Sequence, residues 1–158
     1  MAEKNVLEVE TPGGRCYPIH IESGSLDTVA VFCSRHAPAH RYCVIADSQV
    51  ARLYGERVLE AFRREDINVE LISFSAGEGN KSCEEWSSLS NKLISAGFGR
   101  DSAIVALGGG VTGDLAGFVA ATYMRGVPVV QVPTSLLAML DSSVGGKTGI
   151  DTDAGKNL

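Results

Sequence analysis

The stretch Ser102–Asp114 reads SAIVALGGGVTGD, and it decides the fold of this chain. Its first part, Ser102–Leu107, is short and almost wholly apolar, which is typical of a strand buried on both faces. Gly108–Gly110 then allow a sharp turn because no side chain stands in the way. Thr112–Ala121 is predicted to be a helix whose first N–H groups lack intrahelical partners and point into that turn. Such a place suits an anion, most often a phosphate.

The segments on either side alternate between strand and helix patterns. Residues 6–10 and 17–21 alternate apolar and polar around the turn TPGG, which predicts an N-terminal β-hairpin. The expected fold class is α/β: a Rossmann-like, mainly parallel sheet with flanking helices and that hairpin. The further predicted strands are 41–46, 69–74 and 127–132, the predicted helices are 26–33, 48–64, 82–96 and 134–140, and 141–158 is predicted to be a glycine-rich loop.

Two of these helices have recognisable starts. Asp47 and Ser48 can cap the helix 48–64, whose apolar residues recur at three-and-four spacing. Ser82, followed three residues later by Glu85, forms a capping box. The buried stripe of this second helix is predicted to be Trp86, Leu89, Leu93 and Ile94.

The composition of the 158 residues, 44% hydrophobic and 21% charged, suits one domain with a core. A net charge of −5 without a basic stripe argues against a nucleic-acid partner. Four cysteines without CxxC spacing favour free thiols in a reducing compartment. Since the sequence has neither a signal-peptide pattern nor an apolar run near the roughly 20 residues of a membrane span, we expect a soluble, cytoplasmic protein without a membrane partner.

Ligands of such sheets bind at the carboxyl ends of the strands. Gly108-x-Gly110-x-x-Gly113 matches the dinucleotide fingerprint in a strand–turn–helix context, although a tight turn without a ligand would look the same. The usual acidic residue about 20 positions on is missing, since Val130–Pro133 occupies that region. A bound ribose must therefore be held from another strand end. Those ends carry Asp47, Glu78 with Lys81, Asp114 and Thr134.

Each of these charges also has a simpler interpretation. Asp114 near a helix start can favour the dipole or face a ligand hydroxyl, and Glu78 with Lys81 can be a solvated pair or a contact to ribose and adenine. The spacing Cys33-x2-His36-x3-His40-x2-Cys43 is near that of a zinc knuckle. Because Cys43 falls in an apolar strand, where a buried thiol is ordinary, we predict no metal ligands in this chain.

The densest polar group lies in the loop after Pro133. Asp141, Ser142 and Lys147 stand in the run DSSVGGKT, and Lys156 and Asn157 follow in GKN. The run could be a flexible surface loop, or it could wrap an anion. In the second case, two lysines, an Asp and an Asn near one strand end suit a small, oxygen-rich, acidic substrate.

From about residue 40 onward the chain resembles the 3-dehydroquinate synthase family. The resemblance rests on Gly108–Leu158, with the specific motifs DSSVGGKT and GKN, and on Asp47 and the Gly77-Glu78-x-x-Lys81 loop. It implies a lyase of the shikimate pathway, which leads to chorismate and the aromatic amino acids, converting DAHP to 3-dehydroquinate and phosphate. Bound NAD⁺ transiently oxidises a ring hydroxyl, phosphate is eliminated, the ketone is reduced again, and an aldol closure follows, with zinc polarising the oxidised centre.

The same resemblance implies a role for each matching residue. The pyrophosphate and nicotinamide ribose would be held by Gly109, Gly110, Val111 and Asp114, and the adenosine side by Asp47, Glu78 and Lys81. Thr134, Ser135, Leu137 and Ser142 would line the cofactor. The substrate would meet Asp141, Lys147, Lys156 and Asn157, and Arg125 would contact its phosphate across a homodimer interface. Gln49 departs from the family pattern, which often has Asn there.

The resemblance also implies that residues 1–158 are the N-terminal NAD-binding α/β domain. The zinc ligands of the family, one Glu and two His, lie in a C-terminal helical domain that this chain lacks, so we expect the chain alone to fold without catalysing. Two alternatives stay open. The chain could belong to another sugar-phosphate cyclase, of deoxy-inosose or valiolone type, or it could be a non-catalytic nucleotide-binding module.

Overall fold

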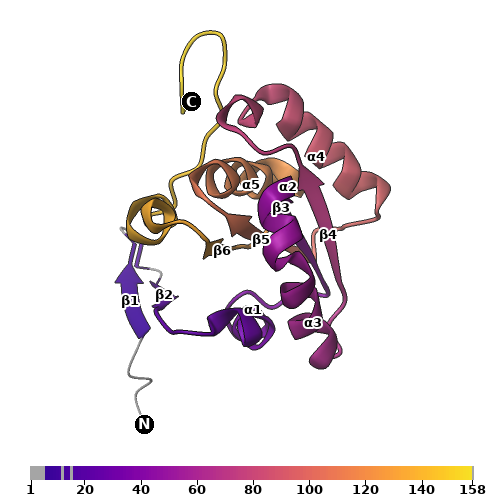
Figure 1. Cartoon of the computed structure of the whole chain (residues 1–158), viewed down its shortest axis with the longest axis vertical. Coiled ribbons are helices and arrows are strands. Elements are labelled where there is room, and N and C mark those ends of the chain that lie inside the picture. Colours follow the sequence, from indigo (N-terminus) through magenta and orange to yellow (C-terminus); the bar gives the residue numbers. More distant parts are fainter. Residues whose placement is uncertain (1–5, 12, 15, 158) are drawn as a thin grey trace.

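A four-stranded sheet forms the centre of the computed structural model, which describes residues 6–11, 13–14 and 16–157 (Figure 1). The strand order is β4-β3-β5-β6, and each of the three pairings is parallel. This confirms the predicted α/β class with a parallel sheet. The strands are β3 (Arg41–Asp47), β4 (Val69–Phe74), β5 (Ser102–Gly108) and β6 (Val129–Pro133).

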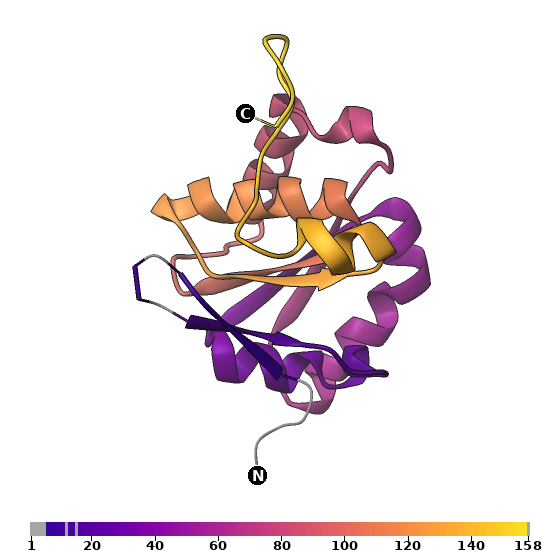
Figure 2. The ribbon, with the colours of Figure 1, turned by 90° about the vertical axis from the view of Figure 1, so that its left-hand side faces the viewer.

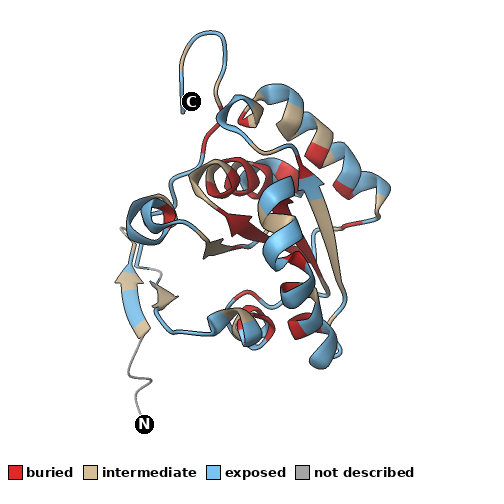
Figure 3. Ribbon diagram, in the orientation of Figure 1, coloured by how far each residue is buried: buried red, intermediate tan, exposed pale blue. Residues whose placement is uncertain are grey.

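Helices cover both faces of this sheet, and α4 and α5 lie opposite α1 and α3 (Figure 1). Alternate residues of β3 point to opposite faces of the sheet. Tyr42 and Val44 pack with α1 and α3, whereas Cys43 and Ile45 pack with α4 and α5. Every residue of β5 is buried (Figure 3). The apolar run 102–107 is therefore a doubly covered central strand, as predicted. The helices are α1 (Val29–His36), α3 (Glu56–Arg64), α4 (Cys83–Ser95) and α5 (Gly110–Thr122).

The predicted N-terminal hairpin is confirmed and lies apart from the main sheet (Figure 2). Strands β1 (Val6–Glu10) and β2 (Cys16–His20) pair antiparallel. In the turn between them, the N–H of Gly14 donates to the carbonyl of Thr11 at 2.8 Å. A 3₁₀ turn, η1 (Ser25–Asp27), connects the hairpin to α1.

The predicted helix 48–64 begins as expected but is not regular throughout. The carboxylate of Asp47 accepts the N–H groups of Gln49 and Val50, and so caps α2 (Ser48–Val50). A π-helical segment, η2 (Ala51–Gly55), then leads into α3. Gly55 lies so close to β4 that a Cβ there would be 2.8 Å from Cδ1 of Leu71. The lack of a side chain on Gly55 therefore lets Leu71 pack directly against the helix backbone.

The predicted buried stripe of α4 is wrong at one position. The hydroxyl of Ser82 accepts the N–H of Glu85 at 3.3 Å, and Leu89 and Leu93 are buried. Ile94, however, is 57% exposed. Successive helical residues are about 100° apart around the axis, so the neighbour of a buried Leu93 points away from the core. Trp86, the fourth residue of the predicted stripe, is half-buried, and its ring contacts the ring of Phe118 edge-on.

The last part of the chain has little regular structure. After η4 (Tyr123–Arg125) and β6, a short helix covers residues 136–142 and includes the π segment η5 (Ala138–Ser142), two residues beyond the predicted end. Up to residue 157, the following segment forms two isolated β-bridges, Ser82 with Asp151 and Thr152 with Gly155. In the described part of the chain, every helix is too short or too polar to cross a membrane.

Candidate functional site

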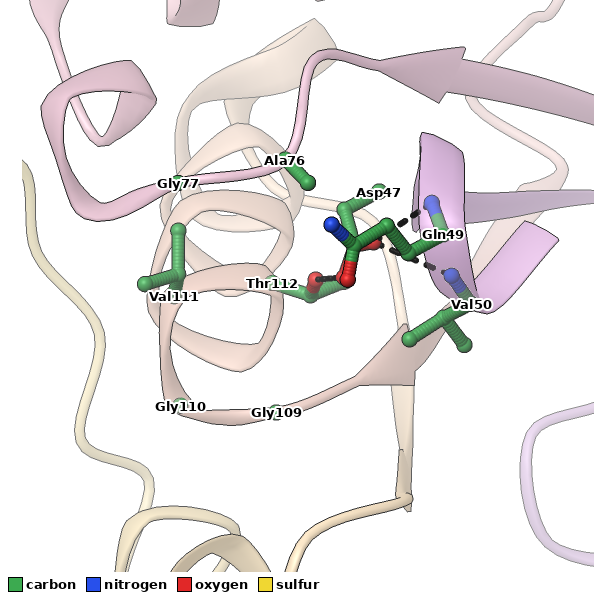
Figure 4. A pocket seen from close by; sticks show the side chains of 9 residues that line it. All are labelled: Asp47, Gln49, Val50, Ala76, Gly77, Gly109, Gly110, Val111 and Thr112. Carbon is green, nitrogen blue, oxygen red and sulfur yellow. Dashed lines mark hydrogen bonds between the residues drawn. The ribbon is translucent and has the colours of Figure 1, made fainter. Parts of the chain in front are cut away.

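A crevice opens at the carboxyl edge of the sheet, between the loops that follow β3 and β5. These two strands are neighbours, but β4 lies beside β3 on one side and β6 lies beside β5 on the other. The connections therefore leave in opposite directions, and the loops separate at this switch point. The crevice has a volume of about 360 Å³ and is lined by Asp47, Gln49, Val50, Ala76, Gly77, Gly109, Gly110, Val111 and Thr112 (Figure 4).

The glycine turn is tight because of close packing and not because of unusual backbone angles. None of Gly108–Gly110 has a positive φ, and α5 begins at Gly110, two residues earlier than predicted. A Cβ on Gly108 would lie 2.3 Å from Oγ1 of Thr112. The expectation that these glycines allow the turn by leaving room is confirmed, and the helix start at Thr112 is the part that the structure corrects.

The start of α5 faces the crevice and presents free N–H groups to it. Gly109 is the N-cap and makes no side-chain cap, so the first turn keeps its unpaired donors. A Cβ on Gly110 would lie 3.3 Å from Oγ of Ser142, which places the helix after β6 directly against the turn. That Oγ is buried and has no hydrogen-bond partner among the described residues. A buried hydroxyl without a partner, next to free N–H groups, fits an anionic ligand.

Asp47 reaches the same crevice from β3. Its Oδ1 accepts the N–H of Gln49 at 2.9 Å and the N–H of Val50 at 3.0 Å, so this oxygen is used by the helix cap. Among the described residues, its Oδ2 accepts only the hydroxyl of Thr112, at a long 3.5 Å (Figure 4). Oδ2 is therefore the oxygen that could accept a ligand hydroxyl. Thr112, which the sequence analysis did not single out, is 1% exposed and joins the two walls of the crevice.

A buried lysine lies at the centre of a second polar cluster. The side chain of Lys81 is 4% exposed, and its Nζ lies 3.3 Å from Oδ2 of Asp114, 3.5 Å from Oε1 of Glu78 and 3.5 Å from Oδ1 of Asp151. It also donates to Oδ1 of Asn157. Burial alone lowers the pKa of Lys81, but the hydrogen bond and charge of Asp114, with the charges of Glu78 and Asp151, outweigh burial and raise this pKa. Lys81 is therefore charged at any physiological pH.

This cluster joins residues that the resemblance assigns to different ligands. Glu78 and Lys81 were expected on the adenosine side, Asp114 at the nicotinamide ribose and Asn157 at the substrate. The structure brings Glu78, Asp114 and Asn157 together around the ammonium group of Lys81. Asp151 was missed, because an isolated acidic residue in a polar loop carries no signal until the loop folds back onto Lys81.

The other predicted substrate contacts lie near the surface. Asp141 and Lys147 form an ion pair with each other, and both side chains are more than half exposed. Lys156 is exposed and close enough to Asp151 to contribute to the lowering of its pKa, after the larger effect of the hydrogen bond from the N–H of Asn157. Asp141, Lys147 and Lys156 are therefore all exposed to solvent.

The residues expected to line the cofactor follow β6. The N–H of Thr134 donates to the carbonyl of Gly108 at 2.9 Å, and a Cβ on Gly109 would lie 3.4 Å from Oγ of Ser135. Both residues therefore lie against the glycine turn. Leu137, in contrast, is 69% exposed.

Arg125 is not brought to the crevice. It follows the C-terminal end of α5, whereas the crevice lies at the N-terminal end of this 13-residue helix. Met124 and Arg125 have φ values of 49° and 72°, in the left-handed region that non-glycine residues seldom occupy. Such strained backbone is concentrated at functional sites in proteins.

The zinc-knuckle alternative is incompatible with the structure. Cys33 packs against one face of the sheet and Cys43 against the other. Burial raises the pKa of each thiol to about 12, so neither is a thiolate. All four cysteines are free, as predicted. Within residues 6–11, 13–14 and 16–157, no three His, Cys, Asp or Glu side chains are placed to hold a metal ion.

The N-terminal hairpin touches the loop that carries Lys147, a contact that the sequence analysis missed. The N–H of Gly145 donates to the hydroxyl of Tyr17 at 3.0 Å. We expect Tyr17→Phe to increase the amide exchange rate of Gly145 about fivefold, because one hydrogen bond is worth roughly 1 kcal/mol. Hydrogen exchange followed by NMR measures it. Tyr54→Phe, on the exposed side of η2, is the matched control, and an unchanged rate in Tyr17→Phe would show that the hairpin does not hold this loop.

Comparison with known proteins extends these observations. The family model described as 3-dehydroquinate synthase N-terminal matches residues 71–158. A 3-dehydroquinate synthase of Symbiobacterium thermophilum is 48% identical over 147 residues, which cover 92% of this chain and 41% of the relative. The chain thus spans about two fifths of the curated relatives that it matches.

Solved structures of two related enzymes have the same fold. A crystal structure of 2-deoxy-scyllo-inosose synthase with carbaglucose-6-phosphate, NAD⁺ and Co²⁺ matches 98% of this chain and 42% of that one, with a TM-score of 0.86 and 30% identity. The valiolone synthase ValA of Streptomyces hygroscopicus subsp. jinggangensis, with NAD⁺ and Zn²⁺ bound, matches 74% of this chain and 32% of that one, with a TM-score of 0.67 and 34% identity. The family match, which extends over more than half of the chain, agrees with the fold and with the glycine turn of the crevice: this chain belongs to the 3-dehydroquinate synthase family.

Proposed function

We propose that this chain is the NAD-binding part of a 3-dehydroquinate synthase, which converts DAHP to 3-dehydroquinate and phosphate. One observation carries the proposal: Asp47, the glycine turn and the Lys81 cluster all lie at the carboxyl edge of one parallel sheet, where such folds bind nucleotides. The identity of 48% to a named 3-dehydroquinate synthase favours this enzyme over the cyclases, which are 30% and 34% identical.

Different crevice residues would bind different parts of the cofactor. The N–H groups of Gly110 and Val111, with the unpartnered hydroxyl of Ser142, would bind the pyrophosphate. Oδ2 of Asp47 would accept a ribose hydroxyl, since Oδ1 is used by the helix cap. Asp114 and Glu78 keep carboxylate oxygens beside Lys81 for further hydroxyls. Gly109, Thr134, Ser135 and Leu137 would complete the wall.

The cofactor, when bound, supplies the reversible oxidation of a substrate hydroxyl. The chain itself would hold the substrate through the Asp141–Lys147 pair, Lys156 and Asn157, because ammonium groups suit a carboxylate and a phosphate. Arg125 would serve the substrate phosphate of a second copy in a homodimer. Its exposed position and strained backbone, away from its own crevice, support a role at a partner's site.

Among the described residues no three His, Cys, Asp or Glu side chains are placed to hold a metal, so the proposal derives no step through it. We infer that residues 1–158 are an N-terminal domain, and that a helical, metal-binding domain completes the active site of a cytoplasmic enzyme. The chain by itself would then bind NAD⁺ and leave DAHP unchanged.

The decisive experiment measures phosphate release from DAHP by the full-length protein with NAD⁺ and Zn²⁺. We expect release from DAHP and none from other sugar phosphates. Preference for another sugar phosphate would indicate a deoxy-inosose or valiolone cyclase instead. Calorimetry with NAD⁺ on this chain tests the crevice separately. Binding without any turnover by the full-length protein would favour a non-catalytic nucleotide-binding module.

A further inference from the structure

The structure points to a residue that links the two halves of the proposed site. We propose that Asp151 is a positioning residue, whose carboxylate and backbone hold the segment carrying Lys156 and Asn157 against Lys81. The residues that bind the cofactor and those that bind the substrate are then positioned together. This inference rests on the proposed function and adds to it a residue that the family resemblance does not assign.

The segment 151–157 is a closed turn with Asp151 at its base. Oδ1 of Asp151 accepts the N–H of Asn157 at 3.0 Å. Between them, Thr152 and Gly155 exchange backbone hydrogen bonds of 2.9 and 3.1 Å, and the hydroxyl of Thr152 accepts the N–H of Ala154 at 3.2 Å. Asn157 has a φ of 56°, in the left-handed region that Asn adopts more readily than most residues. The carboxylate of Asp151 therefore holds the backbone of Asn157 at the base of this turn.

The base of this turn is joined to the Lys81 loop by three interactions. The N–H of Asp151 donates to the carbonyl of Lys81 at 2.7 Å, and Oδ1 of Asp151 lies 3.5 Å from Nζ of Lys81. The same ammonium group donates to Oδ1 of Asn157. Figure 2 shows the segment running across α5 to reach the start of α4.

Contacts on either side extend the linkage to α5. The N–H of Gly149 meets the carbonyl of Asp114 at 3.4 Å, and Nζ of Lys81 lies 3.3 Å from Oδ2 of Asp114. A shift of the Asp151 turn would therefore move Asn157 and release one of the three charges that compensate Lys81. The hydrogen bond from Asn157 is the first cause of the lowered pKa of Asp151, ahead of the charge of Lys81. The contact to the N–H of Asn157 needs only an acceptor oxygen, which an Asn side chain supplies as well as an Asp side chain.

The test compares Asp151→Ala, Asp151→Asn and Asp151→Glu in the full-length protein. The Ala variant removes the acceptor, and we expect the KM for DAHP to rise about tenfold and the Kd for NAD⁺ to rise several-fold. The Asn variant keeps an oxygen at the same place, and we expect both constants within twofold of the wild type. The Glu variant keeps the charge but moves the oxygen by one methylene, and we expect the KM to rise several-fold. Asp153→Ala, an exposed Asp in the same turn, is the matched control with unchanged constants.

These readouts separate positioning from folding. A substitution that only reduces the fraction of folded protein lowers the apparent kcat and leaves KM and Kd unchanged. That result would overturn the proposal. If the Ala variant does not fold, an impaired Glu variant beside an intact Asn variant supports the proposal, and two intact variants overturn it. A wild-type protein that fails to convert DAHP would overturn the proposed function and this inference together. A wild type that converts DAHP, with unchanged constants in Asp151→Ala, would overturn the inference alone.

Discussion

Replacing Gly108 by alanine is expected to lower the free energy of unfolding by about 3 kcal/mol. A Cβ at this position would lie 2.3 Å from Oγ1, 2.5 Å from Cβ and 2.9 Å from Cγ2 of Thr112. Rotating the Thr112 side chain moves Oγ1 and Cγ2 but leaves its Cβ in place. The junction of β5 and α5 must therefore shift, and it lies between fully buried residues on both sides. Urea denaturation of this chain and of the variant measures the change.

Gly79→Ala is the matched control for this substitution. Gly79 also follows a strand at the same edge of the sheet, but a Cβ there would meet nothing within 4 Å, and its φ is not positive. We expect Gly79→Ala to change the free energy of unfolding by less than about 0.5 kcal/mol. Equal effects of the two substitutions would show that the close contact between Gly108 and Thr112 does not constrain the turn.

Lys81→Met is expected to have the second-largest effect and to lower the free energy of unfolding at pH 7 by about 2 kcal/mol. Removing one partner of a buried ion pair costs roughly 3–5 kcal/mol because the other charge stays behind. Here the three carboxylates left behind are partly open to solvent, with side-chain exposures of 55%, 18% and 22%, so the cost is smaller. Lys92→Met is the control. The side chain of Lys92 is 45% exposed, and its Nζ lies 4.0 Å from Oε1 of Glu85 and donates to the carbonyl of Ser73 at a long 3.4 Å. We expect a change of less than about 0.5 kcal/mol.

The pH dependence of the free energy of unfolding tests this prediction most directly. The pKa of Asp151 is lowered in the folded chain, first by the N–H of Asn157 and then by Lys81. A carboxyl whose pKa is lower in the folded than in the unfolded chain stabilises the fold fully above its unfolded-state pKa, which is about 4 for Asp. This stabilisation is lost as the pH falls through the pKa of the folded state. The part that depends on Lys81 therefore disappears in acid. We expect the difference between Lys81→Met and the wild type to shrink from pH 7 to pH 3.5, and a constant difference would contradict the ionic explanation.

The elements of the fold were accessible from the sequence because their signals are local. The buried run 102–107, the cap at Asp47 and the hairpin turn each depend on residues within a few positions of one another. Errors arose where a neighbouring surface decides the outcome. Ile94 fits an apolar pattern, yet it is 57% exposed, because none of the described elements packs over it. Likewise, Ser142 lies against the glycine turn, a closeness that no local pattern predicts.

The sequence by itself determined the parallel α/β core, the glycine turn and the set of polar residues at the strand ends, since hydrophobic periodicity and capping are properties of short segments. Only the tertiary structure decided which of those polar residues meet. Lys81 and Asn157 are 76 residues apart, and Tyr17 and Gly145 are 128 apart. The same folding leaves Arg125 at the far end of α5. Contacts of this kind depend on how loops close over the sheet, and short-range patterns carry no information about that closure.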